Sequence, residues 1–253
     1  MESRPIFRYI HFGESFWYLR EIRKGRKIED ILDEIANVLR DFEEFRLPVT
    51  LRAAHKLKKL GDKFLKLAKD SECTEQQADD LSDIMRNLES TLVAESVGNI
   101  AFIVTDKRID VNKLLYDVPS LLAPDVFDSL FDVARYDFVE AGQCIAFERP
   151  TAAAFHLLRG TESVLRQLYC LSVKRERVEL MWGPMVTHLR QRNKPRFGPL
   201  LNHLDHIRLS FRNPTQHPEK IYDIQEVQDL FGLCVDVVNR MGAFITATKT
   251  KIK

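Results

Sequence analysis

Residues 211–218, Phe-Arg-Asn-Pro-Thr-Gln-His-Pro, place a guanidinium, a carboxamide and an imidazole in one short segment. Arg212 can donate two parallel hydrogen bonds to a phosphate. His217 can give or take a proton near neutral pH, and Asn213 can orient either group or the phosphate. Because Pro214 disfavours helical geometry at Asn213, we expect Arg212 to end one helix and a bend to hold the three side chains together.

Further polar residues lie on the helix that we expect over 151–171. His156, Arg159 and Glu162 recur every three residues, so they fall along one side of it. An ion pair on the helix surface explains His156 and Arg159 about as well as a functional role does. Basic side chains also outnumber acidic ones beyond this helix, and they form our weaker set of RNA-binding candidates: Lys174, Arg175, Arg177, Arg190 and Arg192.

These segments resemble the HEPN (higher eukaryotes and prokaryotes nucleotide-binding) domain family. Its signature is an Arg followed, after four to six residues, by a His, often with a polar residue after the Arg. Four Arg–His pairs have such a spacing here, but only Arg212 is followed by Asn and precedes a final long amphipathic helix. Residues 152–166 look like an early helix of HEPN domains, from which a polar side chain supports the motif Arg. The resemblance covers about 130–247 and makes Glu162 the first candidate for that role, ahead of Arg159 and His156.

The resemblance implies an RNA endonuclease that needs neither a metal nor another cofactor. A ribose 2′-OH would attack the adjacent phosphorus, with His217 moving a proton, Arg212 stabilising charge on the phosphate and Asn213 positioning them. It also implies a homodimer and a toxin or phage-defence effector acting on tRNA or other RNA, with an antitoxin or defence-system protein as a further partner. Pro218 and Glu219 follow His217 where some HEPN toxins carry a Tyr, so we do not expect regulation by adenylylation there.

Other functions fit parts of the sequence. A HEPN domain that binds RNA, a nucleotide or a protein without cutting is the nearest alternative. A metal hydrolase could use His203 and His206, but no matching acidic motif accompanies them, so we favour ordinary helix histidines. Cys170 and Cys234 fall at core positions, which disfavours a catalytic cysteine. We interpret the two tryptophans, Trp17 and Trp182, as packing anchors rather than base-stacking platforms.

The elements that must position these residues are helices. In the second half, apolar spacing predicts helices near 130–148, 151–171, 182–193, 198–211 and 223–247. In the first half, stripes over 28–42, 53–67 and 78–92 predict an antiparallel bundle or a long arm. We therefore expect a mainly α chain, with at most a short β element near 99–105. The expected domains are 1–125 and a HEPN-like helical domain, 126–253.

A ribbon of basic residues follows the second of the first-half stripes. It comprises Arg52, Lys56, Lys59, Lys63 and Lys66. The ribbon could form a track for RNA phosphates. We favour a basic helix flanked by acidic partners, because seven acidic residues accompany the preceding stripe.

Composition limits the class of protein. The 253 residues are 45% hydrophobic and 30% charged, which excludes a disordered chain. The 38 basic residues nearly cancel the 37 acidic ones, so a uniformly basic nucleic-acid coat is excluded as well. The four cysteines include no Cys-x-x-Cys pair, the start resembles no signal peptide, and purely apolar runs are short. We expect a cytoplasmic protein that does not enter a membrane.

Overall fold

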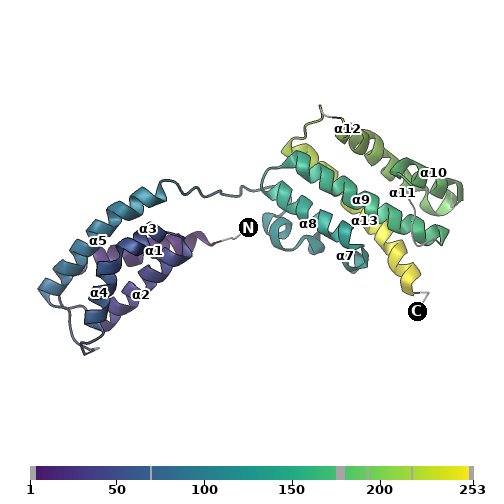
Figure 1. Cartoon of the computed structure of the whole chain (residues 1–253). Coiled ribbons are helices and arrows are strands. Elements are labelled where there is room, and N and C mark those ends of the chain that lie inside the picture. The colour runs from purple at the N-terminus through teal and green to yellow at the C-terminus, as the bar shows by residue number, and fades with distance from the viewer. Residues whose placement is uncertain (1–3, 69, 175–179, 193, 218, 251–253) are drawn as a thin grey trace. The chain divides into compact units, whose positions relative to one another are not determined.

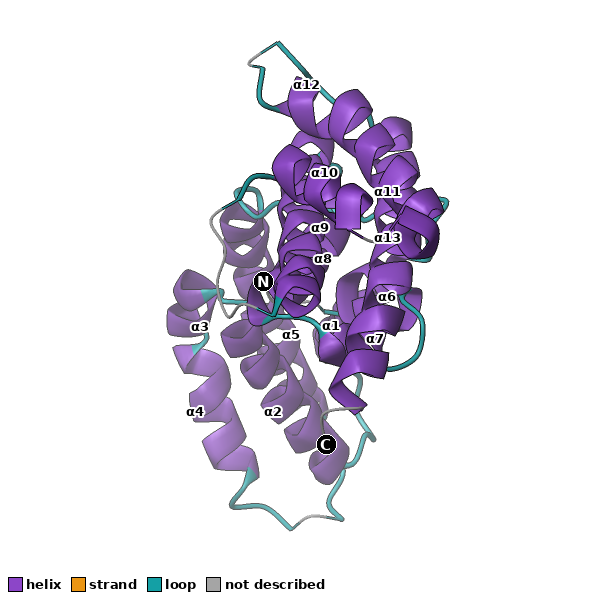
Figure 2. Cartoon of the chain, turned by 90° about the vertical axis from the view of Figure 1, so that its right-hand side faces the viewer, coloured by secondary structure: helices purple, strands orange, loops and turns teal. Residues whose placement is uncertain are grey.

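The computed structural model describes residues 4–68, 70–174, 180–192, 194–217 and 219–250 (Figure 1). Across these ranges the chain is helical and contains no strand (Figure 2), so the prediction of a mainly α fold is confirmed. Residues 99–105, where we expected at most a short β element, form no strand and pair with no other described segment. The single antiparallel bridge in the described ranges joins Lys27 to Glu72. The chain divides into two compact units, Met1–Phe102 and Ile103–Lys253.

The first unit contains five helices in its described residues: α1 (Ile6–Arg20), α2 (Ile28–Glu44), α3 (Pro48–Ala53), α4 (His55–Phe64) and α5 (Glu75–Ser96). The predicted stripes form its core, since Ile35, Leu57 and Leu81 are all buried with their neighbours at helical spacing. A capping box starts α5: the Thr74 hydroxyl accepts from the Gln77 N–H, and the Gln77 side chain accepts from the Thr74 N–H.

The second unit is a bundle around α9. Its helices are α6 (Val111–Tyr116), η1 (Val118–Leu121), α7 (Val126–Ser129), α8 (Asp132–Ala146), α9 (Pro150–Val173), α10 (Trp182–Arg192), α11 (Lys194–Ile207), η2 (Arg208–Arg212), α12 (Asn213–Thr215) and α13 (Ile224–Thr250). α9 packs against α8 and α13, while α10 and α11 pack on each other, α10 on α9 and α11 on α13 (Figure 1). Four of the predicted second-half helices match within a few residues, and the helix expected over 198–211 begins earlier and continues into η2 and α12.

The division between the units lies earlier than the boundary we expected between residues 125 and 126. Leu114, Val118 and Leu122 are buried in the core of the second unit. α6 approaches α8 closely at Gly142, where a Cβ would lie 2.6 Å from the Leu114 carbonyl oxygen. Residues 103–125 therefore belong to the second unit. Their short helical turns bury side chains in its core but are too short to show a long apolar stripe in the sequence.

The last helix, α13, has the length and apolar composition of a membrane-crossing helix, since an 18-residue window within 224–248 has a mean hydropathy of 1.4. A core helix passes the same test. In this unit Val227, Leu230, Cys234 and Met241 of α13 are buried in the hydrophobic core. α13 thus serves as a core helix against which α9 packs.

Candidate active site

A cleft of about 510 Å³ opens in the second unit where two distant segments meet. Its lining residues are Phe155, His156, Leu158, Arg159 and Glu162 of α9 together with Arg212, Thr215 and Gln216 before α13. The fold thus brings Arg212 to the same cleft as His156, Arg159 and Glu162, the three α9 residues named from the sequence. Cationic, acidic and imidazole groups share one water-accessible hollow.

Glu162 holds the guanidinium of Arg212. One Glu162 oxygen accepts from Arg212 Nη2 at 3.4 Å, and the other accepts from Arg166 at the same distance. The Arg212 side chain remains 26% exposed, so its guanidinium is oriented without being enclosed. This is the contact that the HEPN resemblance implied between the α9 helix and the motif arginine.

Asp137 of α8 lies behind the other two polar residues, and the sequence analysis missed it. Its carboxylate is fully buried and accepts from His156 Nδ1 at 2.8 Å and from Arg159 Nε and Nη2 at 2.8 and 2.6 Å. That hydrogen bonding raises the pKa of Arg159. α9 approaches α8 closely at Gly160, which has no Cβ. A Cβ at this position would lie 3.1 Å from the Cβ of Asp137.

The contact with Asp137 also sets the tautomer of His156. An ionised carboxylate can only accept, so Nδ1 is the donor in this contact and Nε2 is the ring nitrogen left to face other groups. An imidazole held in this way can take a proton at Nε2. The signal in the sequence was a carboxylate at a core position: Asp137 follows Ala134 by three residues and precedes Ala141 by four, and both alanines are buried.

The bend that carries the motif differs from the one we expected. Arg212 does not end a helix, because the chain stays helical to Thr215. The turn over 208–212 widens instead, and the Asn213 N–H bonds to the Arg208 carbonyl five residues back. A wider turn accommodates Pro214, whose ring lacks an N–H and crowds the carbonyl four residues before it.

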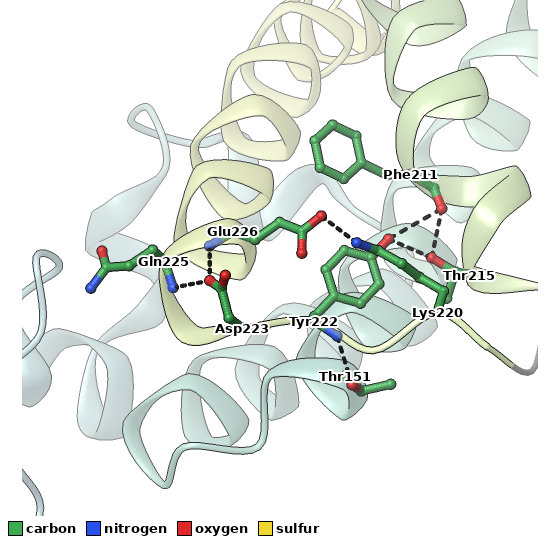
Figure 3. A network of polar contacts seen from close by, with 8 residues as sticks. All are labelled: Thr151, Phe211, Thr215, Lys220, Tyr222, Asp223, Gln225 and Glu226. Atoms are coloured by element: carbon green, nitrogen blue, oxygen red, sulfur yellow. Dashed lines mark hydrogen bonds and ion pairs between the residues drawn. The ribbon is translucent and has the colours of Figure 1, made fainter.

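Side chains fix the chain after this bend (Figure 3). The Phe211 carbonyl accepts from the Thr215 hydroxyl at 2.6 Å and from the Tyr222 hydroxyl at 3.2 Å. Burial raises the pKa of Tyr222, whose backbone N–H donates to the Thr151 hydroxyl on α9. Asp223 then starts α13, since its carboxylate accepts from two backbone N–H groups of the first turn.

The remaining motif residues lie outside the cleft lining. His217 is exposed on the turn, and its backbone N–H donates to the Pro214 carbonyl at 2.9 Å. Asn213 is half-buried, and its carbonyl accepts from the Gln216 N–H. Of the predicted triad Arg212, Asn213 and His217, Arg212 lines the cleft. The imidazole that lines the cleft is that of His156.

The weaker RNA-binding candidates do not line the cleft either. Lys174 and Arg192 are exposed, while Arg190 is paired with Asp205 at 2.9 Å. Arg175 and Arg177 lie outside the described residues.

The alternative chemistries find little support in the geometry. His203 Nδ1 contacts Asp236 at 2.9 Å, but the described ranges contain no group of three His, Cys, Asp or Glu side chains suited to a metal. Burial raises the pKa of Cys234 to about 12, which keeps it a thiol at neutral pH. In the first unit, Lys56, Lys59, Lys63 and Lys66 of the basic ribbon are exposed and form no ion pair with a described residue. Arg52, the first member of the ribbon, interacts electrostatically with Glu95.

The chain was also compared with known proteins. No family model, curated protein or solved structure matches it. The resemblance to HEPN domains therefore rests on the sequence motif.

Proposed function

We propose that the second unit is a metal-independent endoribonuclease of the HEPN type. The observation that carries the proposal is the cleft in which Arg212, held by Glu162, faces the same space as Arg159 and the Asp137-oriented His156. A guanidinium for phosphate charge and an imidazole for proton transfer are the groups that cleavage of an RNA phosphodiester requires.

In the proposed reaction the ribose 2′-oxygen bonds to the adjacent phosphorus and the bond from phosphorus to the 5′-oxygen breaks. The proton of the 2′-OH passes to an imidazole, and the 5′-oxygen takes a proton from an acid, leaving a cyclic phosphate and a free 5′-OH. Arg212 neutralises charge on the non-bridging oxygens. Of the two proton-transfer groups, His156 is supported by its place in the cleft and His217 by the sequence motif. DNA lacks the attacking hydroxyl and should survive.

The test is incubation of the purified chain with total RNA in EDTA, followed by mapping of the fragment ends. We expect 5′-OH ends, and we expect Arg212→Ala, His156→Gln and His217→Ala each to lower the rate by about 10²–10⁴-fold. His203→Gln is the matched control, because this exposed imidazole on α11 is not part of the cleft. Cleavage that appears only with added metal would overturn the proposal.

A non-catalytic RNA-binding module is the second candidate, and the observation that favours it is the position of His217 outside the cleft lining. Its signature is RNA binding without cleavage that persists in both Arg212→Ala and His217→Ala.

As parts of the first proposal, we also propose pairing of two chains and a role as a toxin or defence effector. Light scattering tests the pairing of two chains. Growth arrest on expression, relieved by Arg212→Ala, tests the role as a toxin or defence effector.

A further inference from the structure

A second cleft lies in the first unit, at the end of α1. It has a volume of about 350 Å³, within the range of small-ligand sites. Its lining residues are Trp17, Tyr18, Glu21, Ile22, Arg23 and Arg26. The cleft therefore combines two aromatic rings with two guanidinium groups.

Trp17 is not the packing anchor that we expected. Trp17 is 57% exposed, whereas Trp182 is 1% exposed and does anchor the core of the second unit. The Arg20 guanidinium lies 5.2 Å from the centroid of the Trp17 ring. A large aromatic surface is thus left in water beside a cation, where a flat ligand can reach it.

Within the described ranges, the acidic residues near this cleft pair with basic residues other than its two lining arginines. Arg20 pairs with Glu89 and Glu21, and Lys24 with Glu75. Neither Arg23 nor Arg26 forms an ion pair with any residue that the structure describes, although the Arg26 guanidinium stands 5.9 Å from the Tyr18 ring. The acidic lining residue, Glu21, is itself engaged by Arg20 at 3.7 Å.

Backbone hydrogen bonds fix the loop that carries these charges. The Gly25 N–H donates to the Cys73 carbonyl at 2.9 Å, and the Cys73 N–H donates to the Arg26 carbonyl at 2.7 Å. Gly25 has a φ of +85°, a conformation that favours glycine. The backbone is therefore held in place before any ligand arrives, which lowers the entropic cost of binding.

We propose that this cleft binds single-stranded RNA, with a base stacked on Trp17 and the adjoining phosphates paired with Arg23 and Arg26. Stacking platforms beside positive charge are the usual means of holding single strands without sequence preference. An acidic protein segment would satisfy the arginines but would leave the flat indole face without a matching partner. The proposal does not depend on cleavage in the second unit, since binding at this cleft is measured without it.

The experiment titrates a short fluorescein-labelled oligouridine with the full chain and follows the anisotropy of the label, together with tryptophan emission, in an Arg212→Ala background that prevents loss of the oligonucleotide. We expect quenching, because Trp17 is the exposed member of the two tryptophans. Trp17→Ala should lower the affinity by about 5- to 150-fold, and Arg23→Ala and Arg26→Ala should each reduce the log–log salt slope by about 0.7. Lys58→Ala removes one exposed charge from α4 and is the matched control.

The outcomes separate this proposal from the nuclease. An oligouridine affinity, measured by anisotropy, that falls in Trp17→Ala supports RNA binding here even if no RNA is ever cleaved. If Trp17→Ala leaves the oligouridine affinity unchanged, the proposal for this cleft is overturned, even where the second unit does cleave RNA. Polyglutamate that binds more tightly than oligouridine, in a manner that requires Arg23 and Arg26, overturns it in favour of a protein ligand.

Discussion

The buried carboxylate of Asp137 gives a sharp test of how the proposed active site is built. Replacing Arg159 by methionine keeps most of the side-chain length but removes both hydrogen bonds that the guanidinium makes to Asp137. The carboxylate then remains fully buried with His156 as its partner. Leaving a buried charge underpaired is more costly than losing an ion pair in water.

The magnitude follows from the exposure of the two partners. Removing one member of an enclosed ion pair costs about 3–5 kcal/mol. Arg159 is 61% exposed, so part of its interaction is screened by water and the loss should be smaller. We expect Arg159→Met to lower the free energy of unfolding of the second unit by about 2–3 kcal/mol. The urea midpoint should fall by about 1 M or more.

The assay is urea unfolding followed by Trp182 emission in a Trp17→Phe background, so that the signal reports the second unit. Arg135→Met is the control, because Arg135 pairs with Asp132 on the surface of α8 and should lose less than about 0.5 kcal/mol. In an Asp137→Asn background, Arg159→Met should cost far less, since no charge is orphaned. Equal losses in the two backgrounds would refute the reasoning.

Three further predictions concern the same unit. Gly242→Ala should destabilise the second unit by about 1–3 kcal/mol, because the new Cβ would meet Val126 at 2.5 Å. Gly232→Ala on the same helix is the control and should be neutral or stabilising in the same urea assay. Tyr222→Phe should cost about 1–2 kcal/mol, since it removes a buried hydroxyl with two hydrogen-bond contacts; an unchanged midpoint would count against the network after the bend. Partial burial acts to raise the pKa of Asp236, but hydrogen bonds from a histidine and an arginine outweigh it and lower that pKa. A folded-state pKa below the unfolded value gives stability that is present above the unfolded pKa and lost as pH falls through the folded one. Acid unfolding of Asp236→Asn should therefore show less pH dependence in that window than the parent chain.

Helix positions were largely predictable because apolar spacing directly reflects which side of a helix is buried. α1 escaped this reasoning, since Ile6, Phe7 and Ile10 are exposed and its apolar residues form no single stripe. The domain boundary escaped it as well, because α6 and η1 are too short to show a period. The run at 99–105 is strand-like in local composition but is unpaired in the described ranges, because pairing depends on a partner that local composition does not report.

The candidate site was predictable in its charged parts and not in its support. The spacing of His156, Arg159 and Glu162 indicated one helix side, and the cleft contains all three. Asp137 needed tertiary information, since a single carboxylate among core residues does not say which helix will satisfy it. The widened turn at 208–212 was also hidden, because proline rules describe a regular helix and not the alternative of a wider turn.

The two proposals divide the work of the chain between its units. Chemistry is assigned to a cleft whose groups are held by buried contacts, and this rigidity suits proton transfer between fixed atoms. RNA affinity is assigned to an exposed indole and to two arginines that form no ion pair with a described residue, and stacking of this kind tolerates any base. Joining both sites in one chain raises the local concentration of RNA at the second site once the first has bound. Neither site then needs high affinity alone, which is consistent with a chain whose net charge is only +1.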